Sequence, residues 1–169
     1  IKQSAVWAIL FSLLVIFLYI LFRFRKISYS LGAVAAVFHD VIIVLSVFSI
    51  FYGKLPFSLE IDQAFIAAIL TVIGYSLNDT VVVFDRIREY LNLKKGTKIE
   101  IVNSALNSTL SRTINTSLTT FFVLLVIFLF GGEVIRGFMF ALMVGVIIGT
   151  YSSIFIATPL MIDSQKKNI

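Results

Sequence analysis

The sequence contains no cysteine, and only 14% of its 169 residues are charged. The absence of cysteine excludes disulfides, thiol catalysis and cysteine-ligated metal sites. The sequence also lacks the GxxxxGK[ST] phosphate loop, the HExxH zinc motif and the GxSxG nucleophile turn. The usual equipment for hydrolysis of ATP, peptides or esters is therefore absent. We expect a protein that is not an enzyme and holds no cofactor or metal ion, so that any work it does is driven from elsewhere.

Hydrophobic residues, by contrast, make up 59% of the chain. Soluble domains contain about 45–50% apolar and about 25% charged residues. A soluble chain of this size cannot bury so much apolar surface in one core, whereas a bilayer accepts it on every outward face. Runs long enough to cross a hydrocarbon core about 30 Å thick occur five times. They lie near residues 4–22, 31–52, 62–84, 112–130 and 135–162. The pattern predicts an all-α polytopic bundle of five transmembrane helices.

The Lys and Arg residues of the chain favour one end of the predicted bundle. Eleven fall at that end, namely Arg23, Arg25, Lys26, Arg86, Arg88, Lys94, Lys95, Lys98, Arg112, Lys166 and Lys167. Three fall at the other end, namely Lys2, Lys54 and Arg136. Because cytoplasmic loops accumulate basic residues, this bias predicts that residue 1 lies outside and the C-terminus lies in the cytoplasm.

The segment between the third and fourth runs is the most polar part of the chain. Thr97 and Glu100 have the T-x-x-E spacing of a capping box, which predicts a helix that begins at Thr97. Apolar residues then recur at helical spacing, namely Ile99, Val102, Leu106 and Leu110. We expect a short amphipathic helix over residues 97–110, lying on the inner membrane surface before the fourth span.

Charged residues within the runs are the first candidates for function. An ionisable side chain near the bilayer centre costs about 2.5–3.5 kcal/mol on insertion scales, so it indicates a functional site if it faces a cavity or partner. Asp79 lies in a polar stretch of the third run, and Arg112 opens the fourth run at the same end. A carboxyl group there can bind and release a proton when water enters or an arginine moves. We interpret Asp79, Arg112 and Asn78 as proton-relay candidates, while an Asp79–Arg112 ion pair that only joins two helices remains equally open.

Further polar residues form a second group of candidates. His39 and Asp40 lie within the second run, and His39 is the single histidine of the chain. Adjacent helical positions diverge by about 100°, which argues against one metal ion bound by both. A structural role for His39 is favoured. The fourth run adds a polar stripe that includes Asn115, Thr116 and Thr119. Such a stripe lines water or packs on a polar helix, although Ser and Thr hydroxyls can also bond back to their own helix.

The fifth run carries a small residue at every fourth position. The ladder comprises Gly137, Ala141, Gly145, Gly149, Ser153 and Ala157. Small residues let helix backbones approach closely. Since four residues exceed one turn by about 40°, the ladder winds around its helix. We therefore expect it to pack against two successive neighbours.

Three stretches together resemble one known family. They are residues 74–89 (GYSLNDTVVVFDRIRE), residues 111–120 (SRTINTSLTT) and the region 131–153. They are similar to SecF, the family of membrane subunits that partner SecD beside the bacterial protein-translocation channel. The similarity covers nearly the whole chain, including His39 and Asp40. It implies a resistance-nodulation-division (RND) fold with six spans and an exported-side domain between the first two. Because five spans are present and the chain begins with Ile1 rather than Met, we expect the first span and that domain to be missing.

The resemblance also implies a function. In this family, SecD and SecF use the proton gradient to draw a secreted chain outward across the bacterial or archaeal cytoplasmic membrane. Asp79 matches the intramembrane aspartate of the family and Arg112 matches the arginine of its SRT stretch, both linked to proton movement. The implied partners are SecD, the channel subunits SecY, SecE and SecG, associated insertion factors, exported polypeptides and the lipid bilayer, with no nucleic acid. Two alternatives stay open: an RND-type exporter of small molecules or lipids, and a purely structural subunit of the translocon.

Overall fold

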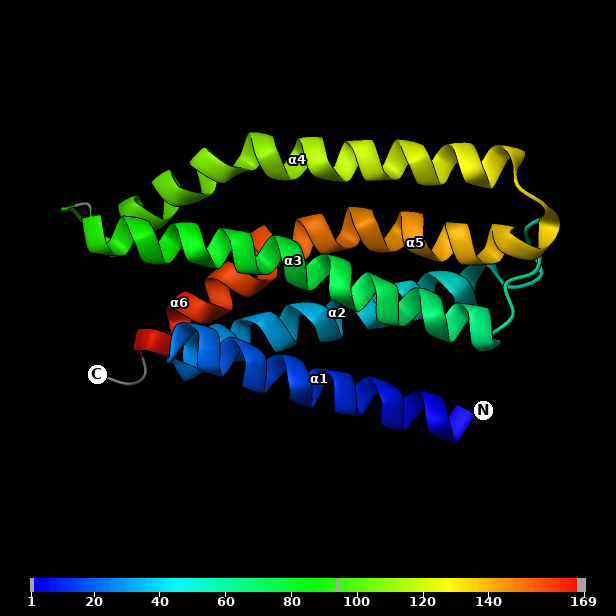
Figure 1. The fold of residues 1–169 in the computed structure, drawn as a ribbon, viewed down its shortest axis with the longest axis horizontal. Helices are drawn as coiled ribbons and strands as arrows, with labels where there is room; N and C mark the ends of the chain where they lie inside the picture. Colours follow the sequence, from blue (N-terminus) through cyan, green and yellow to red (C-terminus); the bar gives the residue numbers. More distant parts are fainter. Residues whose placement is uncertain (1, 94, 167–169) are drawn as a thin grey trace.

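Long helices account for nearly all of the structure, a computed structural model that describes residues 2–93 and 95–166. In chain order they are α1 (Lys2–Phe24), α2 (Ile27–Phe51), α3 (Gln63–Leu93), α4 (Lys98–Phe130) and α5 (Glu133–Ser152), followed by the π-helix η1 (Ser153–Ala157) and α6 (Thr158–Lys166). The long helices run side by side (Figure 1). Within the described residues there is no strand, and five segments are long and apolar enough to cross a membrane. The predicted all-α, five-span bundle is confirmed.

The outer surface of the bundle is apolar, as a lipid-facing surface must be. Large hydrophobic side chains point outward along several helices, for example Phe22 on α1, Phe122 on α4 and Phe155 in η1. A second set of apolar residues is buried where the helices meet, including Ile69 and Phe84 of α3 and Val37 of α2. The helices are therefore apolar on both their lipid-facing and helix-facing sides, so a polar side chain buried between them stands out.

The helix that follows Thr97 is longer than the sequence predicts. Its capping box is confirmed: the Thr97 hydroxyl accepts a hydrogen bond from the backbone N–H of Glu100, and the Glu100 carboxylate accepts one from the N–H of Thr97. The helix does not end at residue 110, however, and α4 continues without a break to Phe130. The prediction of a separate surface helix over residues 97–110 is wrong. No Gly or Pro interrupts the chain between Lys98 and Phe130, so the helix can continue into the membrane span.

The last span changes its helical geometry in its second half. After Ser152 the backbone widens into η1, and α6 begins one residue before Pro159. Proline has no N–H and its ring displaces the carbonyl four residues earlier, so a regular α-helix cannot run through this point. Within this irregular segment the Thr158 hydroxyl donates to the backbone carbonyl of Ser153, five residues earlier, at 3.1 Å. A side-chain bond thus spans the wide turn that precedes the proline.

The small residues of the last span pack against more than one neighbour. A Cβ atom added at Gly145 would lie 2.7 Å from Cγ1 of Val72 on α3, and one added at Gly149 would lie 3.0 Å from the Cβ of Ser76 on α3. Ala141 is fully buried. Farther along, the backbone carbonyl of Ala157 faces Gly32 of α2. Along the last span, the close contacts are therefore made first with α3 and then with α2. The contacts with α3 keep it close to the polar residues of α5.

Candidate functional site

Asp79 lies where α3 meets α4 and α5. Its side chain is 2% exposed, and its Oδ2 atom accepts no hydrogen bond from the residues that the structure describes. The hydroxyl groups of Ser117 on α4 and Thr150 on α5 lie beside its carboxyl group. A buried oxygen without a partner lacks the solvation that water would give it, so a charge on Asp79 is only partly compensated in this position.

The two hydroxyl groups beside Asp79 belong to a short chain of hydrogen bonds. Ser117 Oγ and Thr150 Oγ1 lie 2.5 Å apart, and the Tyr75 hydroxyl donates to Ser117 at 3.3 Å. As an alternative to the bond between them, each of these two hydroxyl groups can donate its proton to a backbone carbonyl of its own helix. Hydroxyl groups both donate and accept, so this chain can reorient when the charge on Asp79 changes. Ser117 and Thr150 are not among the residues predicted from the sequence.

Arg112 approaches Asp79 without forming an ion pair. Arg23–Asp85, His39–Asp40 and Arg86–Glu89 form ion pairs in the described part of the chain, whereas Arg112 and Asp79 do not pair with each other. Arg112 is exposed and lines an open groove of about 430 Å³ between α3 and α4, while its charge acts on Asp79 through space. The structural alternative in which Asp79 and Arg112 join two helices by direct contact is therefore not the arrangement that the structure shows.

The remaining candidates of α3 and α4 face outward. Asn78, Asn115 and Thr119 are exposed, and Thr116 is half-buried. The hydroxyls of Thr116 and Thr119 donate to backbone carbonyls of their own helix at 2.9 Å. The predicted polar stripe exists, but no described helix of this chain covers it. In a bilayer this surface calls for water or a polar partner.

Asp40 forms a second buried carboxyl site, and its setting is the opposite of that of Asp79. It is fully buried, and its Oδ2 accepts hydrogen bonds from Ser76 on α3 at 2.5 Å and from Ser152 on α5 at 2.8 Å. Its Oδ1 lies 3.1 Å from Nδ1 of His39, whose side chain is 31% exposed. Both carboxylate oxygens have partners. Ser76 precedes Asp79 by three residues on α3, yet its hydroxyl bonds Asp40.

Another pair of hydroxyls extends this polar cluster along α3. Thr80 and Ser153 are both buried, and their hydroxyl oxygens lie 2.9 Å apart. Ser153 also donates to the backbone carbonyls of Gly149 and Ser76. Ser153 belongs to the small-residue ladder that was predicted to pack against neighbouring helices. For Thr80 the sequence showed only a Thr within an apolar run, which does not say whether its side chain faces inward.

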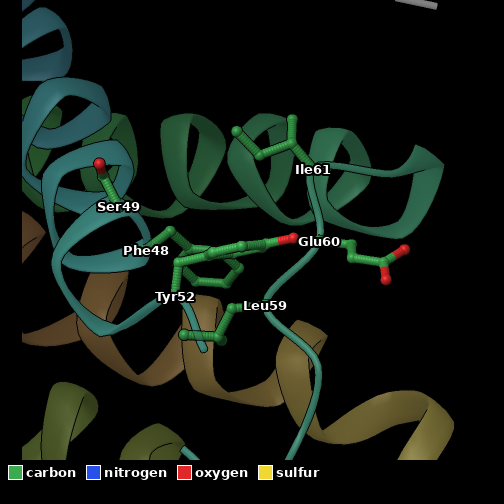
Figure 2. Close-up of a pocket in the computed structure, with 6 residues that line it drawn as sticks. All are labelled: Phe48, Ser49, Tyr52, Leu59, Glu60 and Ile61. Atoms are coloured by element: carbon green, nitrogen blue, oxygen red, sulfur yellow. The ribbon is translucent and has the colours of Figure 1, made fainter. Parts of the chain in front are cut away.

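A wide hollow of the surface lies away from the buried carboxyl groups. It measures about 490 Å³ and is lined by the end of α2 and the loop before α3, at Phe48, Ser49, Tyr52 and residues 59–61. Figure 2 shows the Glu60 carboxylate pointing away from the rings of Phe48 and Tyr52. The hollow is open and contains none of the proton-relay candidates. It offers no enclosed chamber for a transported small molecule.

Comparisons with known proteins agree on one family. Residues 1–167 match the family described as "Protein export membrane protein SecD/SecF, C-terminal". The chain is 62% identical over 167 residues to the protein translocase subunit SecF of Rhodothermus marinus, covering 98% of this chain and 54% of that protein. It is 50% identical over 165 residues to SecF of Desulfurispirillum indicum, covering 95% of this chain and 50% of that protein. The chain thus spans about half the length of these relatives.

A solved structure has the same fold. The crystal structure of SecDF in super-membrane-facing form superposes with a TM-score of 0.87 at 41% sequence identity. The alignment covers 99% of this chain and 22% of that chain. The arrangement of helices around the two buried carboxyl groups is therefore one that a larger membrane protein also contains.

Proposed function

This chain belongs to the SecD/SecF family of protein-export membrane proteins, and on that premise we propose that it is the membrane part of a SecF subunit that couples the proton gradient to late steps of protein export. The observation that carries the proposal is the buried Asp79 carboxyl, which has one oxygen without a partner. No enzymatic reaction is needed for this role, since proton movement supplies the work.

Asp79 would bind and release the proton. When it is charged, stabilisation can come from reorientation of the Ser117 and Thr150 hydroxyls and from approach of Arg112, which is not engaged in a direct ion pair with it. When it is neutral, the unpartnered oxygen no longer carries an uncompensated charge. The two protonation states therefore favour different positions of α4 relative to α3, which is how a proton can bias a conformational equilibrium.

The outward polar stripe supports a partner on this side of the bundle. Asn78 of α3 and Arg112, Asn115 and Thr119 of α4 are exposed together in a chain whose outer surface is mostly apolar. Uncovered polar groups are costly in hydrocarbon, so a second set of polar helices fits this face. We propose SecD as that partner, in line with the SecDF structure that this chain matches. The other proposed partners are the SecY, SecE and SecG channel, insertion factors and exported polypeptides.

The basic residues support an orientation in the cytoplasmic membrane. Arg23, Arg25 and Lys26 lie at or beside the turn between α1 and α2, at the same end as Lys95 and Lys98 between α3 and α4. We propose that this basic end faces the cytoplasm of a bacterium or archaeon, that the C-terminus lies there, and that residue 1 lies outside.

Gradient-driven export in membrane vesicles tests the proposal. The full-length subunit is assembled with SecD and the channel, and Asp79→Asn is compared with Asp85→Asn, which removes an exposed carboxylate from the same helix. Asp85 is paired with Arg23 at the surface, where such pairs contribute about 0–1 kcal/mol. We expect Asp79→Asn to abolish the gradient-dependent part of export and the associated proton flux, and Asp85→Asn to keep both. Normal gradient-dependent export by Asp79→Asn would refute the proposal.

A further inference from the structure

The proton-coupling role does not use Asp40, although Asp40 is the most completely enclosed charged side chain in the described part of the bundle. Resting on the proposed function, we propose that Asp40 is a positioning residue for Asp79: its carboxylate clamps α3 to α5 and so sets the geometry in which Asp79 binds a proton. The clamp consists of Asp40, Ser76 and Ser152.

The clamp joins the two helices that build the Asp79 site. Ser76 precedes Asp79 by three residues on α3, and Ser152 follows Thr150 by two residues on α5. At 1.5 Å per residue these separations are about 4.5 Å and about 3 Å along the helix axes. Both serine hydroxyls donate to the same oxygen, Oδ2 of Asp40. One atom of α2 thus fixes α3 relative to α5 within a single turn of Asp79 and its hydroxyl neighbour.

The contacts around the clamp explain how it can control the position of α5 relative to α3. Gly149 lies against Ser76 so closely that α3 and α5 meet backbone to backbone at this level. On the far side of Ser152 the α-helix gives way to η1, where the regular hydrogen-bond pattern is interrupted. Irregular turns of this kind are frequently found at functional sites and let one helical segment shift relative to the next. The clamp therefore holds the last regular α-helical turn of α5, immediately before the irregular segment η1.

The two buried carboxyl groups are suited to different tasks. Asp40 has a partner for each oxygen, from α2, α3 and α5, whereas Asp79 has a buried oxygen without one. Of the titratable groups, His39 on the same helix contacts Asp40, and the ring of Tyr151 of α5 lies 6.4 Å from that of His39. Asp79 follows Ser76, a partner of Asp40, by three residues on α3. A fully bonded carboxylate acts as a fixed anchor, and a partly bonded one responds to its surroundings.

Infrared titration of Asp79 separates positioning from simple stabilisation. The full-length subunit is reconstituted with SecD in liposomes, and the band of the protonated Asp79 carboxyl is identified by its loss in Asp79→Asn. We expect Asp40→Asn to move the pH midpoint of this band by about one pH unit or more, which is a tenfold change in proton affinity. Ser152→Ala, which leaves the other two partners of Asp40 in place, should move the midpoint in the same direction by a smaller amount.

The control is Ser30→Ala, which removes another buried hydroxyl from α2 that has no hydrogen-bond partner among the described residues. It should leave the Asp79 midpoint unchanged. If Asp40→Asn and Ser152→Ala lower the melting temperature but leave the midpoint where it was, the positioning role is refuted and Asp40 is only structural. The export assay with Asp79→Asn reports separately on proton coupling, so either idea can fail while the other stands. If the Asp79 band does not titrate at all, both fail.

Discussion

Gly145 offers the sharpest test of how the bundle is packed. In Gly145→Ala the new Cβ would lie 2.7 Å from Cγ1 of Val72, and Val72 is 1% exposed, so its side chain has no free space into which to turn. Overpacking of this kind costs about 1–3 kcal/mol. The gain in helix propensity from Gly to Ala offsets about 1 kcal/mol. Taking the upper end of the packing cost, we expect a net loss of about 2 kcal/mol in the free energy of unfolding.

Gly74→Ala is the matched control for this substitution. Nothing lies within 4 Å of a Cβ atom placed at Gly74, so this substitution gains helix propensity at no packing cost. It should leave the protein unchanged in stability or slightly more stable. Unfolding is followed by circular dichroism and tryptophan fluorescence in detergent micelles. A second variant, Val72→Ala in the Gly145→Ala background, should recover part of the loss, since neighbouring substitutions couple by about 0.5–3 kcal/mol. Equal stability of Gly145→Ala and Gly74→Ala would refute the close contact between α3 and α5.

Three further predictions follow from the hydrogen bonds and exposures described above. Thr97→Ala removes the capping box and should destabilise the start of α4 by about 1 kcal/mol, seen as faster amide hydrogen exchange there. Thr80→Val keeps the shape but removes the bond to Ser153, and should lower the free energy of unfolding by about 1 kcal/mol, whereas Thr119→Val at an exposed position should change it by less than about 0.5 kcal/mol. Asn115→Leu should weaken co-purification with SecD while leaving the melting temperature of the isolated subunit unchanged; normal recovery of the pair would count against the polar stripe as the contact surface.

Hydropathy alone locates the spans but not the full helices. The five apolar runs coincide with helices because a bilayer requires both apolar side chains and internally bonded backbones. The error at α4 has a clear cause. A change from polar to apolar composition near Arg112 marks where the surroundings of the helix change, whereas the helix itself ends only where its backbone bonding is interrupted, after Phe130.

The candidate site was predicted in part, for a related reason. A sequence gives the position of a residue along a helix, so it identified Asp79 and Asp40 as charges inside spans. It does not give the rotation of one helix against its neighbours. Ser117 and Thr150 were therefore missed although they adjoin Asp79, and the sequence could not decide whether Arg112 pairs directly with Asp79. Which hydroxyls face inward depends on tertiary packing, and helical periodicity constrains this only within each helix.

The length of α4 has a mechanical consequence. With 33 residues it measures about 50 Å, some 20 Å more than a hydrocarbon core, and α3 with 31 residues is nearly as long. The two helices pack against each other and extend together toward the turn at Thr97, as Figure 1 shows. Leu93 lies about 21 Å beyond Asp79 along α3. A tilt of about 10° at the level of Asp79 therefore moves the tip of this hairpin by about 4 Å. The α3–α4 hairpin therefore acts as a lever arm. A sub-ångström shift of the helices around the Asp79 carboxyl group becomes a displacement of the hairpin tip that is large enough to change its contacts with a neighbouring protein.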